Sequence, residues 1–204
     1  MEPDAPETAH ALASLADGVV VVGASAGGVE ALATFVGALP LHTPQAVCVV
    51  LHISPSAPSA MPDILGRAAR MPVHRPTDGE PLLAGHIYVA PPDHHLEVER
   101  GRIRLTQSPP DHGHRPSVDA TMRSAAEAYD AGAVGVVLTG SQDDGTAGLQ
   151  AIKRRGGTAL VQDPREARYP SMPTSAIAHV AIDAVLPLEE MAGWLAARGP
   201  RVAG

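Results

Sequence analysis

The chain has 204 residues, of which 45% are hydrophobic and 18% are charged, as is usual for a globular domain. Its net charge of -7 and its aromatic content of 2% argue against a nucleic-acid-binding protein, because such proteins need a basic surface and stack bases on aromatic side chains. The chain has one cysteine, no apolar run of membrane-spanning length and an acidic start unlike a signal peptide. We therefore expect a cytoplasmic protein with no internal disulfide and no membrane insertion.

Short apolar runs along the chain predict strands. Residues 1–16 are polar, acidic and rich in alanine, and we interpret them as a flexible lead-in to a single domain at residues 17–204. Within that domain, apolar runs predict strands at residues 18–23, 46–51, 86–90, 133–138, 158–161 and 184–186. Those at 18–23, 46–51 and 133–138 are expected to be buried. Two alternating runs, 95–98 and 102–105, flank Glu99-Arg100-Gly101 and predict a β-hairpin.

Helical segments separate these strands. They are predicted at residues 27–39, 62–70, 118–131, 146–155, 173–179 and 187–197, with Ser117 as the N-cap of the third. Strands that alternate with helices imply a mostly parallel sheet covered on both faces. The predicted fold class is therefore α/β: a single doubly wound domain with a mostly parallel sheet and one antiparallel hairpin. In such a domain Cys48 is expected to be a small buried hydrophobic residue.

Three kinds of reactive side chain follow three of the predicted strands. Ser25 follows the first strand, His52 follows the second, and Asp143 and Asp144 follow the strand at 133–138. Ligands of open α/β sheets bind beyond the carboxyl ends of the strands, so these side chains are expected at one edge. A hydroxyl, an imidazole and a carboxylate are the groups needed for nucleophilic acyl transfer. Their chemistry alone does not choose between Asp143 and Asp144.

The segment Gly23-Ala24-Ser25-Ala26-Gly27 has the G-x-S-x-G spacing of a nucleophile elbow, in which a sharp turn between strand and helix exposes the serine hydroxyl. The helix that follows would direct its first N–H groups at an oxyanion. Two other interpretations stay open: a phosphate-binding turn of a non-catalytic nucleotide-binding module, and a plain bend with Ser25 as a helix cap. The order Ser, His, Asp differs from the Ser, Asp, His order of the α/β-hydrolases.

At these residues the chain resembles the catalytic domain of the CheB family, the chemotaxis methylesterases, from about residue 18 to residue 188. The resemblance is carried by Gly23-Ala24-Ser25-Ala26-Gly27-Gly28, Leu51-His52, Ala90-Pro91-Pro92-Asp93-His94-His95, Arg115-Pro116-Ser117-Val118-Asp119, Val136-Val137-Leu138-Thr139-Gly140, Asp144-Gly145-Thr146-Ala147-Gly148-Leu149, Val161-Gln162-Asp163-Pro164 and Met172-Pro173. The order and spacing of these segments make the resemblance specific.

The resemblance implies that Ser25 is the nucleophile, that His52 is the general base and then the acid, and that Asp144 orients the imidazole. The implied substrates are glutamate γ-methyl esters on the helical cytoplasmic region of methyl-accepting chemotaxis receptors. Deamidation of particular glutamines is a further activity that the family implies. The resemblance implies no cofactor and no metal, and it leaves the oligomeric state open.

The chain also departs from the family pattern. Many members have Thr where this chain has Ala26, and Met-Gly where it has Ser141-Gln142. A polar pair beside the acid leaves open an esterase with the same triad and a different substrate. The family's receiver domain has no counterpart here, which fits either an excised fragment or a stand-alone enzyme without phosphorylation control.

Histidines outside the predicted triad invite other interpretations. His94-His95 and His112-x-His114 suggest a metal site, but no Asp or Glu stands at a familiar ligand spacing from them, so we expect none. His94 and Arg115 are instead candidates for lining the substrate cleft. Trp194, on the last predicted helix, is expected to pack against the sheet.

Overall fold

A seven-stranded sheet forms the centre of the computed structural model, which describes residues 14–52 and 60–198. Its order is β3-β4-β2-β1-β7-β8-β9, and every neighbouring pair is parallel. These strands are β1 (Val19–Ala24), β2 (Ala46–Leu51), β3 (Val73–His74), β4 (Ile87–Val89), β7 (Ala133–Val137), β8 (Thr158–Gln162) and β9 (Ala184–Leu186). The chain places β2 on one side of β1 and later places β7 on the other side. The direction in which strands are added to the sheet therefore reverses beside β1.

The central strands are buried on both faces. All residues of β1 and β2 are buried. Side chains alternate along a strand, so Val19 and Val21 contribute to one hydrophobic core while Val20 and Val22 contribute to the other. Cys48 on β2 is fully buried, which confirms its predicted place. The unbroken β-branched runs in the sequence are therefore strands that pack against apolar side chains on both sides.

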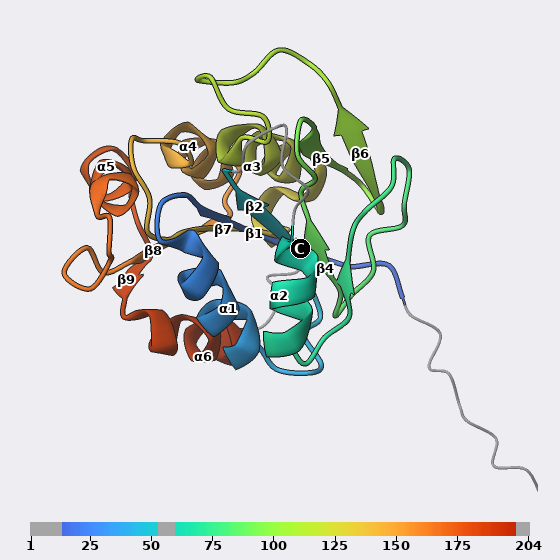
Figure 1. Ribbon diagram of the computed structural model, residues 1–204, viewed down its shortest axis with the longest axis horizontal. Helices are drawn as coiled ribbons and strands as arrows, with labels where there is room; N and C mark the ends of the chain where they lie inside the picture. Colours follow the sequence, from blue (N-terminus) through green and yellow to red (C-terminus); the bar gives the residue numbers. More distant parts are fainter. Residues whose placement is uncertain (1–13, 53–59, 199–204) are drawn as a thin grey trace, which may run out of the picture.

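Helices cover the two faces of the sheet in two groups (Figure 1). One group comprises α1 (Gly28–Ala38), α2 (Met61–Ala68) and α6 (Leu188–Arg198), and the other comprises α3 (Val118–Tyr129), α4 (Thr146–Arg154) and α5 (Ser171–His179). Phe35 in α1 and Met191 in α6 belong to one core, whereas Met122 in α3 and Leu149 in α4 belong to the other. This is the doubly wound α/β arrangement predicted from the alternation of strands and helices.

The predicted hairpin is present as a separate two-stranded antiparallel sheet. It consists of β5 (His95–Glu99) and β6 (Arg102–Thr106), each one residue longer than predicted. Leu96, Val98 and Ile103 pack into the same core as Met122 of α3. The hairpin therefore extends the helical layer on that face of the main sheet instead of adding a strand to it.

Local differences from the predicted elements have simple causes. The strand β3 was not predicted because its two residues are too few to show a periodicity. The third predicted helix ends at Tyr129 instead of residue 131, because Asp130 has a φ of 46° and starts a short 3-10 turn, Asp130–Gly132. Ser117 is the N-cap of α3, as predicted, and its hydroxyl accepts a hydrogen bond from the N–H of Ala120.

Near the chain ends, residues 1–13 of the predicted lead-in lie outside the described residues. Its last residues pair with the segment before β4, where Ala84 N donates to Ser14 O and Ala16 N donates to Leu82 O, each at 3.0 Å. Trp194 is partly buried and packs against the core shared by α1 and α6, as expected. Within residues 14–52 and 60–198, no helix is long and apolar enough to cross a membrane.

Candidate active site

The three predicted residues meet at the carboxyl edge of the sheet, beside β1, where the strand order reverses. Ser25 directly follows β1 and His52 directly follows β2, while Asp144 lies in the loop between β7 and α4. The strands β2, β1 and β7 are neighbours in the sheet, so the loops that follow them are neighbours as well. Residues separated by up to 92 positions in the sequence are thereby brought into hydrogen-bonding contact.

Ser25 lies in a tight turn between β1 and α1, as the G-x-S-x-G spacing predicts. Its N–H donates to the carbonyl of Thr139 at 3.0 Å, and its own carbonyl accepts from Gly28 N at 2.9 Å. Gly27, directly before the helix, has a φ of 72°. Glycine adopts this left-handed conformation without the steric penalty of a Cβ atom, so the chain reverses here and leaves the hydroxyl of Ser25 at the sheet edge.

A second glycine, Gly140, lets the loop after β7 pack closely against Ser25. A Cβ atom on Gly140 would lie 2.0 Å from Met172 Sδ and 2.9 Å from Ser25 Cβ. The backbone of Gly140 donates to Tyr169 O at 2.8 Å and accepts from Met172 N at 3.0 Å. The segment before α5 is thus fixed against the turn that carries Ser25.

A hydrogen-bonded chain joins the three side chains. Ser25 Oγ lies 3.1 Å from His52 Nδ1, and His52 Nε2 lies 2.6 Å from Asp144 Oδ2. An ionised carboxylate only accepts hydrogen bonds, so Nε2 carries the proton and Nδ1 presents its lone pair to the serine hydroxyl. The imidazole is thereby oriented in the tautomer that accepts a proton from Ser25, with the two ring nitrogens in the reverse of the roles they have in chymotrypsin-like proteases.

Asp144 is buried and is held by the start of α3. Its Oδ1 accepts from Ser117 Oγ at 3.1 Å and from Asp119 N at 2.8 Å, and its Oδ2 accepts from Val118 N at 2.8 Å as well as from His52. Burial alone would raise the pKa of Asp144, but the hydrogen bonds from His52, Asp119 and Val118 together hold it below its ordinary value. The carboxylate therefore stays ionised and acts as an acceptor for the imidazole.

A further buried carboxyl group lies beside this acid. Asp119 is 2% exposed, and its Oδ1 accepts from Gly145 N at 2.9 Å and Gly148 N at 2.6 Å. Burial first, and then the negative charge of Asp144, raise the pKa of Asp119 to about 6. Sequence reasoning gave Asp119 no role beyond the family motif, although its place two residues after a predicted N-cap marked it as a first-turn acid.

The structure separates the two adjacent acids that the residue chemistry left open. Asp143 is exposed, and its backbone carbonyl accepts from Thr146 N at 3.0 Å. Asp144 points inward to His52 and the start of α3. The geometry therefore singles out Asp144, the residue that the family resemblance favoured, as the partner of the imidazole.

The loop before α3 covers one face of His52, which sequence reasoning did not predict. His114 stacks on the His52 ring with centroids 3.8 Å apart and planes 7° from parallel. Its Nε2 lies 3.0 Å from Gln142 Oε1, in the loop that also carries Asp144. Ring stacking between residues of two distant loops leaves no periodic signal in the sequence.

The two other residues suggested for the cleft are engaged elsewhere. Arg115 donates to Asp93 Oδ1 from Nε at 3.1 Å and from Nη2 at 2.5 Å, and its Nη1 donates to the carbonyls of Gln107 and Ser108. His94 Nδ1 lies 3.1 Å from Pro92 O. Arg115 therefore fastens the loop that carries His114, and neither side chain is bonded to the three residues of the hydrogen-bonded chain.

The histidine pairs weighed as metal ligands do not converge. His95 is buried with its Nε2 3.2 Å from Pro109 O, and His112 is exposed beside Asp111. In the described part of the chain, no group of three or more His, Cys, Asp or Glu side chains is arranged to hold a metal ion.

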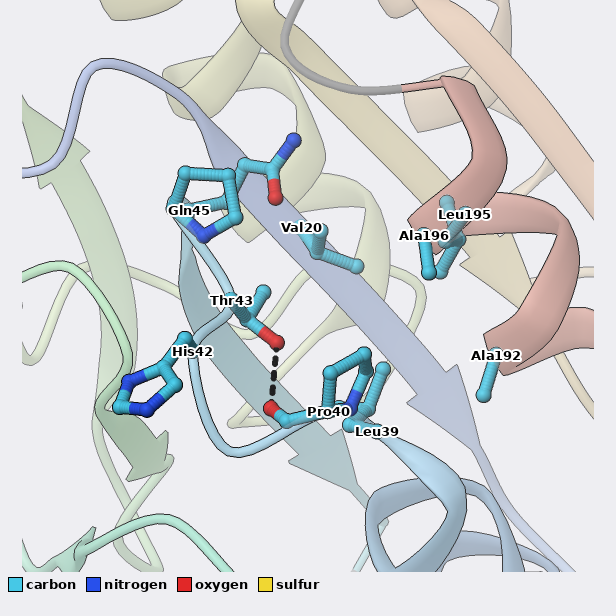
Figure 2. Close-up of a pocket in the computed structure, with 10 residues that line it drawn as sticks. Val20, Leu39, Pro40, His42, Thr43, Gln45, Ala192, Leu195 and Ala196 are labelled. Carbon is cyan, nitrogen blue, oxygen red and sulfur yellow. Dashed lines mark hydrogen bonds between the residues drawn. The ribbon is translucent and has the colours of Figure 1, made fainter.

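A largely apolar cavity of about 290 Å³ lies at the opposite end of the sheet (Figure 2). It is lined by Val20 near the start of β1, by the segment after α1 and by Ala192, Leu195 and Ala196 of α6. Thr43 Oγ1 donates to Pro40 O there at 2.8 Å. His42 is the one acid–base side chain among its lining residues, so this cavity lacks the groups for acyl transfer that the carboxyl edge provides.

Comparison with protein families gives a match to CheB methylesterases over residues 20–195. A protein-glutamate methylesterase/protein-glutamine glutaminase of Geobacter metallireducens is 36% identical over 200 residues, which cover 94% of this chain and 55% of that protein. A putative protein of the same name from Leptospira interrogans is 36% identical over 174 residues, covering 85% of this chain and 90% of its own length. The chain thus spans about half the length of the first of these relatives and nearly all of the second.

Comparison with solved structures gives a crystal structure of the Thermotoga maritima CheB methylesterase catalytic domain. It superposes with a TM-score of 0.83 at 33% sequence identity, and the match covers 87% of this chain and 96% of that domain. The chain therefore shares its α/β fold with that catalytic domain.

Proposed function

The chain belongs to the CheB methylesterase family, and on that basis we propose that it is a serine hydrolase that cleaves γ-methyl esters of glutamate side chains. The observation that carries the proposal is the continuous hydrogen-bonded chain from Ser25 through His52 to the buried Asp144. In this proposal Ser25 is the nucleophile, His52 is the general base and acid, and Asp144 orients and stabilises the imidazole.

The first half of the reaction forms an acyl-enzyme. The Ser25 hydroxyl transfers its proton to His52 Nδ1 as Oγ attacks the ester carbonyl, and the carbonyl oxygen becomes an oxyanion. Asp144, bonded to the opposite ring nitrogen, stabilises the imidazolium that forms. The proposed donors to the oxyanion are N–H groups in the first turn of α1 beyond Gly28, whose own N–H donates to the carbonyl of Ser25.

The second half releases the products. The tetrahedral intermediate collapses, the bond to the methoxy group breaks, and methanol leaves with the proton returned by His52. Water then attacks the glutamyl ester of Ser25, with His52 as the base, and the glutamate carboxylate and the free serine are regenerated. Deamidation of a glutamine is the same attack with ammonia as the leaving group.

The substrate and its location are part of the proposal. The names of the relatives support glutamate esters and glutamine amides of proteins as substrates. We assign these to the helical cytoplasmic region of methyl-accepting chemotaxis receptors, and we place the protein in the cytoplasm because that region is there. The family match over residues 20–195 supports a single catalytic domain within residues 17–204.

The test has two arms. In the first, the protein is exposed to a fluorophosphonate probe and the labelled residue is identified by mass spectrometry. We expect labelling at Ser25 and none in Ser25→Ala, whose rate of ester hydrolysis should fall on the order of 10⁶-fold. His52→Ala should label far more slowly than the wild type. His42→Ala is the matched control, since that exposed histidine lies by the apolar cavity and should label normally.

In the second arm, methanol release is measured from chemoreceptor fragments carrying glutamate methyl esters. Release that depends on Ser25 supports the proposed activity. Labelling at Ser25 without methanol release would assign the triad to a different ester. Absence of labelling in folded protein would overturn the hydrolase, and thermal stabilisation by nucleotides would then favour a binding module.

A further inference from the structure

Gln142 has a backbone conformation that is unfavourable for residues other than glycine. Its φ is 68°, in the left-handed region where a side chain with a Cβ atom is unfavourable. The residue lies in the loop between β7 and α4, two positions before Asp144. Strained conformations persist where the surroundings hold them, and they concentrate at functional sites.

The side chain of Gln142 contacts His114. Its Oε1 lies 3.0 Å from His114 Nε2, in the loop before α3. That loop is itself closed by a backbone pair, in which Asp111 N donates to His114 O at 3.0 Å and His114 N donates to Asp111 O at 2.9 Å. Gln142 therefore ties the loop that carries the acid to the loop that carries His114.

The His114 ring, held by Gln142, stacks on the ring of His52. The two rings are stacked at 3.8 Å with an angle of 7° between their planes. Both nitrogens at the edge of the His52 ring are already engaged, one with Ser25 and one with Asp144. The edge contacts fix two points of the imidazole, and the stack fixes the plane in which it lies.

We propose that Gln142 and His114 are positioning residues, which hold the plane of the His52 imidazole for proton transfer with Ser25. The inference rests on the proposed function, because it assigns these side chains a part in the same reaction. It gives a strained, exposed glutamine beside Asp144 a role: its amide oxygen anchors the ring that covers His52. Neither side chain is hydrogen-bonded to Ser25, and both act through the position of the His52 ring.

The experiment measures the second-order rate of labelling by the fluorophosphonate probe, together with kcat and KM for p-nitrophenyl acetate. In Gln142→Gly the acceptor is lost while the backbone strain is relieved. We expect a melting temperature equal to or above that of the wild type, and labelling slowed about tenfold, the effect of losing one net hydrogen bond. The loss should appear in kcat, with KM unchanged.

Variants of His114 separate the stack from the hydrogen bond. His114→Ala removes both, and we expect slower labelling than in Gln142→Gly. His114→Phe keeps a flat ring against His52 and should restore part of the rate lost in His114→Ala. Because Gln142 is proposed to act through His114, adding Gln142→Gly to His114→Ala should slow labelling no further. His112→Asn is the matched control, since this neighbouring histidine is exposed and asparagine tolerates its φ of 49°.

The outcomes distinguish this inference from the proposed function. Labelling of Gln142→Gly at the wild-type rate would overturn the positioning role while leaving the hydrolase intact. Additive losses in the double variant would also overturn it, because they would mean that Gln142 acts independently of His114. A wild-type protein that is not labelled at all would overturn the proposed function and this inference with it.

Discussion

The backbone N–H of Asp119 donates to Asp144 Oδ1 at 2.8 Å, so two buried carboxyl groups lie next to each other at the start of α3. Their pKa values move in opposite directions. Hydrogen bonds outweigh burial at Asp144 and lower its pKa, whereas burial and the charge of Asp144 raise the pKa of Asp119 to about 6. Between pH 3.8 and about pH 6 the folded protein therefore keeps the proton on Asp119 while Asp144 is ionised.

The raised pKa of Asp119 predicts a specific dependence of stability on pH. The unfolded chain loses this proton near pH 3.8, while the folded protein keeps it until about pH 6, so the contribution of Asp119 to stability falls as the pH rises through that window. In Asp119→Asn the amide oxygen still accepts from Gly145 and Gly148 without a charge. Relative to the wild type, this variant should gain on the order of 3 kcal/mol between pH 4 and pH 7.

Urea unfolding of both proteins at pH 4, 5.5 and 7 checks this expectation. Asp143→Asn serves as the matched control, because this exposed acid lies in the loop between β7 and α4 and its substitution leaves the carboxyl group of Asp119 in place. A difference for Asp119→Asn that is the same at all three pH values would contradict the assignment.

Asp144→Asn should slow the reaction strongly, because an amide cannot replace both oxygens of this carboxylate. Each carboxylate oxygen accepts two hydrogen bonds, so either orientation of an amide directs its NH₂ group at two donors. The imidazole then loses its preferred tautomer, and we expect the rate of probe labelling to fall by on the order of 10⁴. Asp143→Asn should label at the wild-type rate. Equal losses in the two variants would show that the loop conformation, and not the acid, had been disturbed.

Cys48 should be chemically silent in the folded protein. Burial raises the pKa of its thiol to about 12, so almost no thiolate forms at neutral pH, and the side chain is inaccessible in the centre of β2. Iodoacetamide should therefore modify Cys48 only when the protein unfolds. Following modification by mass spectrometry at increasing urea concentrations should reproduce the unfolding transition measured by circular dichroism. Fast modification without urea would mean that β2 opens locally.

Much of the fold could be predicted because its signals are local. The runs that became β1 and β2 are β-branched throughout, which is the pattern of strands with helices on both faces. The order of strands and helices also predicts that Ser25, His52 and the pair Asp143-Asp144 lie at one edge of the sheet. The short strand β3 was missed because two residues carry no pattern.

The surroundings of the three residues could not be predicted in the same way. Asp144 is held by N–H groups of α3 that lie at least 25 positions away, and backbone donors have no residue-type signature. The stack of His114 on His52 depends on how two loops fold over the sheet edge. The sequence did mark Ser141-Gln142 as unusual, and the structure adds that Gln142 combines a left-handed backbone with a bond to His114.

Gly140 provides the strictest test of how closely the site is packed. The Cβ atom of an alanine there would overlap Met172 Sδ and press on Ser25 Cβ, so the loop after β7 has to move away from the nucleophile. We expect Gly140→Ala to lower the free energy of unfolding by about 1–3 kcal/mol and to slow probe labelling, because the turn that carries Ser25 bonds to Thr139. Gly66→Ala is the matched control, since this exposed glycine of α2 has open space around it and should gain about 0.5–1 kcal/mol. If both substitutions stabilised the protein in urea unfolding, the contact between Gly140 and Met172 would not be tight, and Ser25 would have room to move.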